Sequence, residues 1–253
     1  MELKSSNPAL KDGLMQPGQL ISYGDGSLTI QGTINKTFIL SLILIATGAF
    51  TWQQCAQALA SGNTGLISPY LWGGAIVGLI LGFVTAFKRE WCHITAPLYA
   101  AAQGVFLGAV SLMYELQFSG LVFQAVLATI GTLFAMLFAY RTGMLKATET
   151  FRKVITLATM GVGLLYLISF GLSFFLKFNL PIFESGLIGI GFSIFVVALA
   201  ALNLILDFDF IEQAAAQGVP KQLEWYGAFG LMVTLIWLYL ELLRLLSKLR
   251  SRR

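Results

Sequence analysis

The chain has 253 residues, of which 57% are apolar and only 11% charged, and its mean hydropathy is +0.79. This composition excludes an ordinary soluble domain and indicates an integral membrane protein with one membrane domain. The formal net charge of +4 arises largely from the C-terminal end, which favours contact with anionic membrane lipids and argues against nucleic acid as a partner.

Three regions are predicted along the chain. Residues 1–36 form a polar N-terminal tail, because they lack the charged region, apolar core and cleavage site of a signal peptide. Residues 37–246 form the membrane domain, and residues 247–253 form a basic C-terminal tail.

Seven apolar segments predict an all-α, polytopic membrane helix bundle. At about 1.5 Å rise per residue, some twenty residues of helix cross a hydrocarbon core of roughly 30 Å. The first segment is slightly short, unless it extends toward Ala60. The segments are Thr37–Trp52, Tyr70–Phe87, Ile94–Tyr114, Phe118–Tyr140, Val154–Leu176, Ser185–Leu206 and Trp225–Leu246.

The second segment carries Gly74, Gly78 and Gly82 at four-residue spacing. This spacing places small residues on one helix face and predicts close packing against a neighbouring helix.

Basic residues in the connections predict the orientation, because lysine and arginine are held on the cytoplasmic side. They gather before the first segment and in the second, fourth and sixth connections, so the N-terminus is expected in the cytoplasm. These residues are Lys4, Lys11, Lys36, Lys88, Arg89, Arg141, Lys146, Arg152, Lys153 and Lys221.

Seven full crossings would then place the basic C-terminal tail outside, in conflict with the same rule. Two explanations stay open: the tail violates the rule, or one of the last segments enters the membrane and returns on the same side.

The strongest candidate for function is Asp207, in the stretch LNLILDFDFIE at residues 202–212. It directly follows a long uncharged run. An ionisable side chain at such a position costs several kcal/mol unless it faces the bundle interior, a partner or water, so it marks a functional site.

Asp209 projects about 200° away from Asp207 around a helix, so the two acids cannot face one partner. Asn203 lies four residues before Asp207 and is predicted to support it with a hydrogen bond. Asp209 and Glu212 share a different face, where helix-end charges in contact with water are the alternative interpretation.

Glu241 is the second acid within an apolar segment, and Arg244 follows it by three residues on the same helix face. A local ion pair near the helix end is the alternative to a role in ion passage. The chain is expected to break at Gly218–Pro220. A straight antiparallel hairpin then sets Asp207 and Glu241 at depths roughly 15 Å apart and brings residues near Leu231 to Thr234 opposite Asp207.

Enzymatic chemistry is not expected. His93 is the only histidine and lies in a charged connection beside Cys92, so neither a serine–histidine pair within the membrane nor a histidine-based metal site can form. Nucleotide-binding fingerprints are missing, and so is the glycine-rich context of an intramembrane aspartyl protease. We predict no cofactor and no bound metal. The absence of a convincing internal repeat argues against a secondary transporter.

Several motifs carry a family resemblance. PLYAAAQGVFLGAVS at residues 97–111 resembles the third-helix signature of the Bax inhibitor-1 family, including its bacterial YccA-like members. GTINKTFIL, LILDFDFIEQ and LYLELLRLL, at residues 32–40, 204–213 and 238–246, are similar to the YccA-like branch. This branch implies residence in the bacterial inner (plasma) membrane.

The resemblance implies seven helices with the C-terminal helix at the centre, and a pH-dependent calcium leak controlled by two acids. Asp207 in LILD matches the first acid best, with Asp209 as an alternative. Glu241 in LYLE matches the second. If Arg244 is aligned with the family's C-terminal arginine, Thr234 takes the second position instead. Gln103 replaces the glutamate usual in the third-helix signature.

Two functions follow as hypotheses. The first is a leak channel for calcium or other cations, gated by protonation of Asp207, with Glu241 and Asp209 in the ion pathway and Asn203 and Arg244 in support. The second is a regulatory protein that binds other membrane proteins, such as proteases or cell-death factors, without conducting ions.

Overall fold

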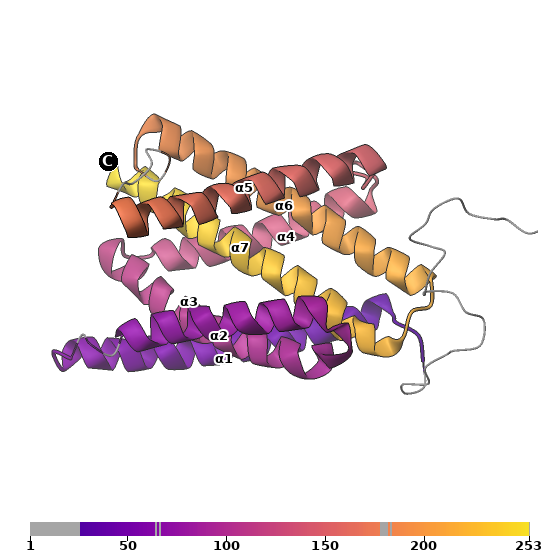
Figure 1. Cartoon of the computed structure of the whole chain (residues 1–253), viewed down its shortest axis with the longest axis horizontal. Helices are drawn as coiled ribbons and strands as arrows, with labels where there is room; N and C mark the ends of the chain where they lie inside the picture. The colour runs from indigo at the N-terminus through magenta and orange to yellow at the C-terminus, as the bar shows by residue number, and fades with distance from the viewer. Residues whose placement is uncertain (1–25, 64, 66, 178–181, 183, 253) are drawn as a thin grey trace, which may run out of the picture.

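The computed structural model describes residues 26–63, 65, 67–177, 182 and 184–252, and these form an all-helical bundle. Within these ranges, seven helices are long and apolar enough to cross a membrane, which confirms the predicted class of an integral membrane helix bundle (Figure 1). They are α1 (Ile30–Ala60), α2 (Ile67–Phe87), α3 (Cys92–Gln117), α4 (Leu121–Arg141), α5 (Glu149–Leu176), α6 (Leu187–Ala216) and α7 (Glu224–Ser251).

The first and last helices extend into the predicted tails. α1 begins at Ile30, because the extended residue Thr29 caps it and its hydroxyl accepts a hydrogen bond from the Gly32 amide at 2.9 Å. α7 continues through Ser251, so most of the basic C-terminal segment is helical. The predicted residues Lys4 and Lys11 lie outside the described part of the chain.

The break between the last two helices lies where glycine and proline predict it. α6 ends at Ala216, and Gly218 adopts a left-handed backbone conformation with φ +64°. Pro220 then precedes a single 3₁₀ turn, Lys221–Leu223, which leads into α7.

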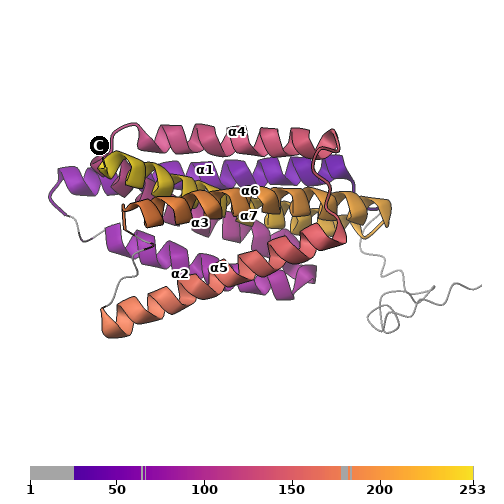
Figure 2. The same cartoon turned by 90° about the horizontal axis from the view of Figure 1, so that it is seen from above.

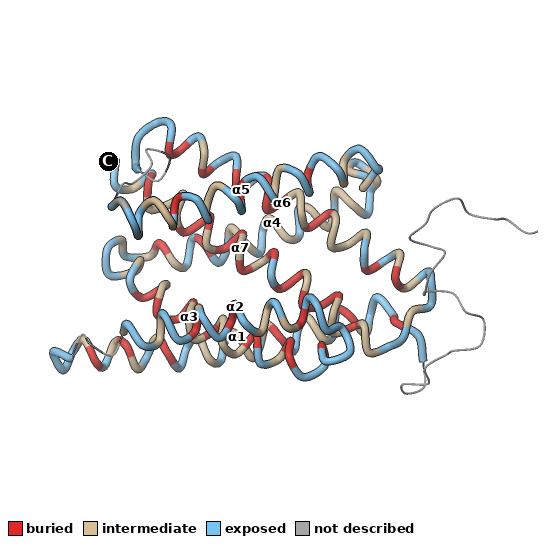
Figure 3. The backbone as a smooth tube through the Cα atoms, viewed as in Figure 1, coloured by how far each residue is buried: buried red, intermediate tan, exposed pale blue. Residues whose placement is uncertain are grey.

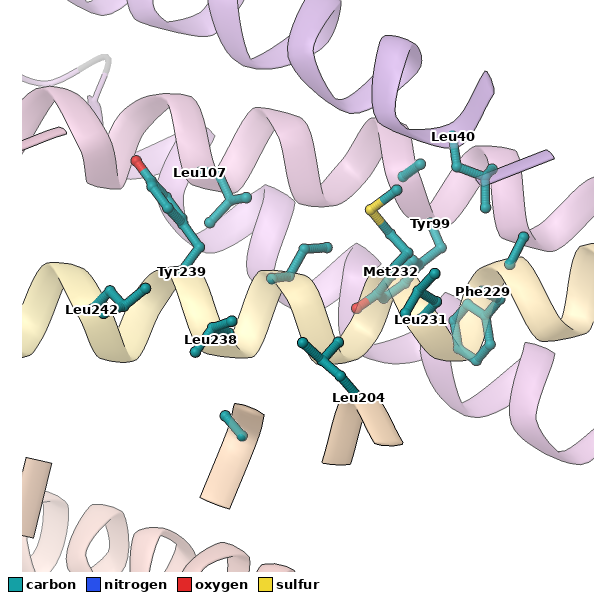
Figure 4. Packing of buried hydrophobic residues seen from close by; sticks show 14 of the residues in the cluster. Leu40, Tyr99, Leu107, Leu204, Phe229, Leu231, Met232, Leu238, Tyr239 and Leu242 are labelled. Carbon is teal, nitrogen blue, oxygen red and sulfur yellow. The ribbon is translucent and has the colours of Figure 1, made fainter. Parts of the chain in front are cut away.

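The C-terminal helix α7 is the centre of the bundle. It packs against α1, α3, α4 and α6, and buried segments recur along its length in Figure 3. Its large apolar side chains meet those of the surrounding helices in one continuous core, shown in part in Figure 4. They include Phe229, Met232, Leu238, Tyr239 and Leu243 from α7 and Leu40, Tyr99, Leu107, Leu121 and Leu204 from its neighbours.

The outer surface of the bundle is largely apolar. Large side chains such as Phe87, Leu157 and Leu167 are mostly exposed, and each lies on a helix long enough to span a bilayer. Outward apolar faces of this extent match a hydrocarbon environment. In Figure 2, α5 diverges from the other helices at one end of the bundle, and it packs mainly against α6.

The glycine face of α2 packs against α3, as its spacing predicts. A Cβ atom on Gly74 would meet the Phe106 amide nitrogen at 2.7 Å, and one on Gly78 would meet the Gln103 side chain at 2.6 Å. α1 approaches the opposite side of α3 equally closely, since a Cβ on Gly104 would lie 2.4 Å from the Leu44 carbonyl oxygen. Small residues thus bring three backbones together.

The basic connections gather at one end of the bundle, and the C-terminus lies at the other. Lys36 near the start of α1 contacts Glu224 at the start of α7, and Gln222 contacts His93 near the start of α3. At the opposite end, Ser251 of α7 donates a hydrogen bond to Ser185, just before α6. α7 therefore runs the full length of the bundle, and neither of the last two helices turns back as a re-entrant segment.

The C-terminal basic residues largely serve internal contacts. Arg244 binds Glu241, Lys248 binds backbone carbonyls near the start of α6, and Arg250 donates a hydrogen bond to the Ser119 carbonyl oxygen at 2.6 Å. These contacts give Arg244, Lys248 and Arg250 a structural role on whichever side of the membrane this end lies.

Candidate functional site

Asp207 projects from α6 toward α7 in the interior of the bundle. The residue as a whole is half-buried, but its Oδ2 atom is inaccessible to solvent and has no hydrogen-bond partner among the described residues. An enclosed carboxyl oxygen of this kind is rare, because buried polar groups are normally paired.

The groups that face Asp207 come from one stretch of α7. The hydroxyl of Thr234, which donates a hydrogen bond to the Gly230 carbonyl oxygen at 3.3 Å, lies close to the carboxyl group. One turn earlier, Gly230 also lies beside the carboxyl group, since a Cβ atom at that position would be in ordinary contact with Asp207 Oδ1 at 3.8 Å. This agrees with the register of the predicted hairpin, which brings residues near Thr234 opposite Asp207.

Asn203 does not support Asp207 by a hydrogen bond, contrary to the prediction. Its Nδ2 atom donates to Thr159 Oγ1 of α5 at 2.9 Å and to the Leu199 carbonyl oxygen of its own helix at 2.8 Å. The side chain therefore points toward α5, where a hydroxyl and a backbone acceptor satisfy both amide protons.

Asp209 and Glu212 face away from Asp207, as helix geometry predicts, and lie near the basic end of the bundle. Asp209 forms an ion pair with Arg152 of α5 at 2.5 Å and accepts a hydrogen bond from Gln213. Glu212 accepts a hydrogen bond from the Tyr140 hydroxyl of α4. These contacts hold the end of α6 between α4 and α5.

Glu241 forms the local ion pair with Arg244 that the sequence offers as one alternative. Arg244 Nη1 lies 2.9 Å from Glu241 Oε1 and 3.1 Å from Oε2. Tyr166 of α5 joins them: its hydroxyl donates to Glu241 at 2.8 Å and accepts from Arg244 at 2.8 Å. Glu241 is only 2% exposed, so this carboxylate is buried within the bundle instead of reaching the lipid headgroups.

The two acids suggested by the family resemblance are not brought together. Asp207 lies beside Gly230 and Thr234, whereas Glu241 lies about two turns further along α7 with its own cationic partner. Asp207 and Glu241 thus lie at different depths in the bundle, as a straight antiparallel pairing of α6 and α7 predicts.

Lys248 is a further buried charge that the sequence reasoning did not single out. Its ammonium group donates to the carbonyl oxygens of Ile182 and Gly189 and to Ser193 Oγ, at 2.8 to 3.0 Å. Acceptors from the start of α6 thus hold the end of α7 in place of a carboxylate.

Glu224 was also missed by the sequence reasoning, although it is fully buried. Its carboxylate forms an ion pair with Lys36 at 2.5 Å and accepts hydrogen bonds from the amide and hydroxyl of Thr29, each at 3.0 Å. An acid at the start of α1 also suits the positive end of that helix. Gly32 permits this approach, because a Cβ atom there would lie 2.1 Å from Glu224 Oε1.

Among the described residues, no three histidine, cysteine or acidic side chains gather in a way that could hold a metal ion. Both cysteines, Cys55 and Cys92, are free and buried.

Comparison with protein families gives a match over nearly the whole chain. The model of the family described as Bax inhibitor 1 like covers residues 6–251, nearly the whole chain. The chain belongs to the Bax inhibitor 1-like family. No curated protein and no solved structure matches it.

The family match extends over all seven helices, including both of the helices that enclose Asp207. Within this Bax inhibitor 1-like bundle, Asp207 is distinguished from Asp209, Glu224 and Glu241 by its surroundings. Each of those three carboxylates lies within 3 Å of a lysine or arginine nitrogen, whereas a carboxyl oxygen of Asp207 is enclosed without a hydrogen-bond partner.

Proposed function

We propose that this protein is a pH-sensitive leak channel for calcium or other cations, in which Asp207 senses protons. The observation that carries the proposal is the enclosed Oδ2 atom between α6 and α7, the helix pair at the centre of the bundle. Membership in the Bax inhibitor 1-like family supports it, because the family resemblance implies this activity.

The proposed gate is the contact between α6 and α7 around Asp207. A charged carboxylate enclosed without a counter-ion costs several kcal/mol, whereas a neutral carboxyl group beside Thr234 and Gly230 costs much less. The neutral form therefore fits the packing described above. Loss of the proton favours arrangements that admit water or a cation to the carboxylate, so cation flux is expected to rise as the pH is raised.

In this proposal the other acids line or border the route of the ion. Asp209 lies toward the basic end and Glu241 toward the opposite end, each with an arginine partner in the packed state. Arg244 holds Glu241 until the helices separate, and Asn203 fixes α6 against α5.

The proposed location is the inner (plasma) membrane of a bacterium, with the N-terminus in the cytoplasm and the protein in the YccA-like branch. The gathering of basic connections at the end where α1 begins supports the orientation. The motifs at residues 32–40, 204–213 and 238–246 support the branch.

Calcium flux into liposomes, measured from acidic to mildly alkaline pH, tests the proposal. Asp207→Asn keeps the size of the side chain but stays neutral, so we expect low flux and a flat pH profile. Glu149→Gln is the matched control, because this acid is 91% exposed and lies at the bundle end; it should behave as wild type. A wild-type pH profile in Asp207→Asn would overturn the role of Asp207. An absence of flux in the wild type at every pH would favour a regulatory membrane protein that binds other membrane proteins.

A further inference from the structure

A groove of about 1040 Å³ lies between α1 and α4, with α6 and α7 as its floor. Its volume is at the upper end of the range of ligand sites, roughly 300–1,000 Å³. Most of its lining is apolar and includes Ile34, Phe38, Phe134, Leu137, Phe208 and Leu235.

The hydroxyl groups in the wall formed by α1 are already satisfied. Thr33, Thr37 and Ser41 each donate a hydrogen bond to a carbonyl oxygen one turn earlier, at 2.8 to 3.1 Å. These hydroxyl protons are already donated to backbone carbonyls. An aliphatic chain can therefore lie along this wall without leaving hydrogen-bond donors unpaired.

The groove opens sideways on the surface that faces lipid. Phe38 of α1 and Phe134 of α4 line it and are 63% and 64% exposed. Each belongs to a helix long enough to cross the membrane. Lipid chains of the surrounding bilayer therefore reach this opening directly.

One end of the groove carries a small net positive charge. Arg141 and Lys146 line this end and are exposed, and within the described part of the chain neither forms an ion pair with an acid. Two acids lie nearby, but Asp209 is paired with Arg152 and Glu212 accepts a hydrogen bond from Tyr140. Because Arg152 neutralises Asp209, the end of the groove where α4 and α6 terminate offers two exposed cations and one carboxylate, Glu212, whose described partner is a neutral hydroxyl.

We propose that this groove binds one anionic phospholipid of the surrounding membrane. The phosphate group lies between Arg141 and Lys146, and an acyl chain lies between α1 and α4 toward Ser41. Charge complementarity selects the headgroup, because basic residues at a membrane surface attract anionic lipids. The apolar walls retain the chain by removing it from contact with mobile lipid.

The headgroup part of the site is tested with phosphatidylglycerol and phosphatidylcholine, added to the protein in detergent and counted by native mass spectrometry. We expect the wild type to retain phosphatidylglycerol preferentially. The double variant Arg141→Gln and Lys146→Gln should bind it about 30-fold more weakly, as expected for two basic contacts.

The matched control is the double variant Lys88→Gln and Arg89→Gln, which removes the same charge from the same end of the bundle. Lys88 and Arg89 lie over the rings of Trp91 and Tyr226, outside the groove. This control should bind lipid as the wild type does. An equal loss in both double variants, or no preference for phosphatidylglycerol in the wild type, would overturn the proposal.

The chain-binding part is tested by Ser41→Leu, which narrows the groove away from its charged end. Gly131→Leu is the control: it adds a side chain of the same size on α4 at a position with open space around it and outside the groove. We expect Ser41→Leu alone to weaken phosphatidylglycerol binding. If Ser41→Leu retained the lipid as tightly as Gly131→Leu, the lipid would be adsorbed only through its headgroup, and the proposed groove site would be wrong.

Discussion

Thr234 of α7 faces the carboxyl group of Asp207, whereas Glu241 lies about two turns away and is paired with Arg244. A hydroxyl group thus occupies the place opposite the first acid that the resemblance assigns to a second acid. Because threonine does not ionise near neutral pH, Asp207 is the only titrating group among the described residues at this point of the α6–α7 contact. The pH response of this protein should therefore be that of one carboxyl group.

Substitution Thr234→Asp should convert this contact into a pair of acids. Two adjacent carboxyl groups cannot both ionise easily, so the pH at which flux rises should move upward by about one unit or more. Thr234→Asn, which has nearly the same size and no charge, is the control and should keep the wild-type midpoint. Liposome flux profiles check this; the same midpoint in wild type and Thr234→Asp would contradict the contact.

Breaking the ion pair between Glu241 and Arg244 should destabilise the bundle. Glu241→Gln should lower the free energy of unfolding by about 2–4 kcal/mol, at the low side of the range for buried pairs because the Arg244 side chain is 33% exposed. The double variant Glu241→Leu and Arg244→Met leaves no unpaired charge. Its loss in free energy of unfolding should therefore be smaller than the sum of the losses of Glu241→Leu and Arg244→Met measured singly. Denaturation in detergent measures this, and strictly additive losses would argue against a coupled pair.

Gly32→Ala should disturb the contact that joins the first and last helices. The added Cβ atom would collide with the Glu224 carboxylate, so the Lys36 and Thr29 contacts must shift, at a cost of about 2–3 kcal/mol. Gly73→Ala is the control, because nothing lies within 4 Å of its added Cβ and alanine favours the helix. Thermal unfolding should show a lower midpoint for Gly32→Ala only; equal midpoints would refute the close approach.

The two ends of the bundle should lie on opposite sides of the membrane. Cysteines introduced at Lys153 and at Arg252 are exposed at opposite ends, whereas the native Cys55 and Cys92 are buried and should react slowly. A membrane-impermeant maleimide applied to intact cells should label one position, and inverted vesicles the other. Labelling of both positions from the same side would show that the helices do not all cross.

Local features explain what the sequence predicts well. The helices follow from long apolar runs, and the break before α7 from Gly218 and Pro220. The position of Asp207 opposite Thr234 follows from counting residues outward from that break, because helical rise is constant. The Glu241–Arg244 pair also follows from helix geometry, because residues three apart lie on the same helix face.

The features that the sequence does not predict are contacts between residues far apart in the chain. Glu224 meets Lys36 across 188 residues of sequence, and no local pattern connects them. Asn203 shares a helix face with Asp207, yet Thr159 and the Leu199 carbonyl take its amide protons, and only the position of α5 reveals this. The one available signal for Glu224 was a charged residue directly before an apolar run, which is also the ordinary pattern of a helix end.

The central position of α7 has a consequence for biogenesis. The ribosome makes this helix after the other six, so those six helices enter the bilayer without the element that α1, α3, α4 and α6 all contact. Until α7 leaves the translocation machinery, Asp207 has no Thr234 beside it, and Lys36 has no Glu224. A nascent chain that stops before Glu224 would therefore lack the centre of its core, and the membrane quality-control system should degrade it instead of tolerating a six-helix product.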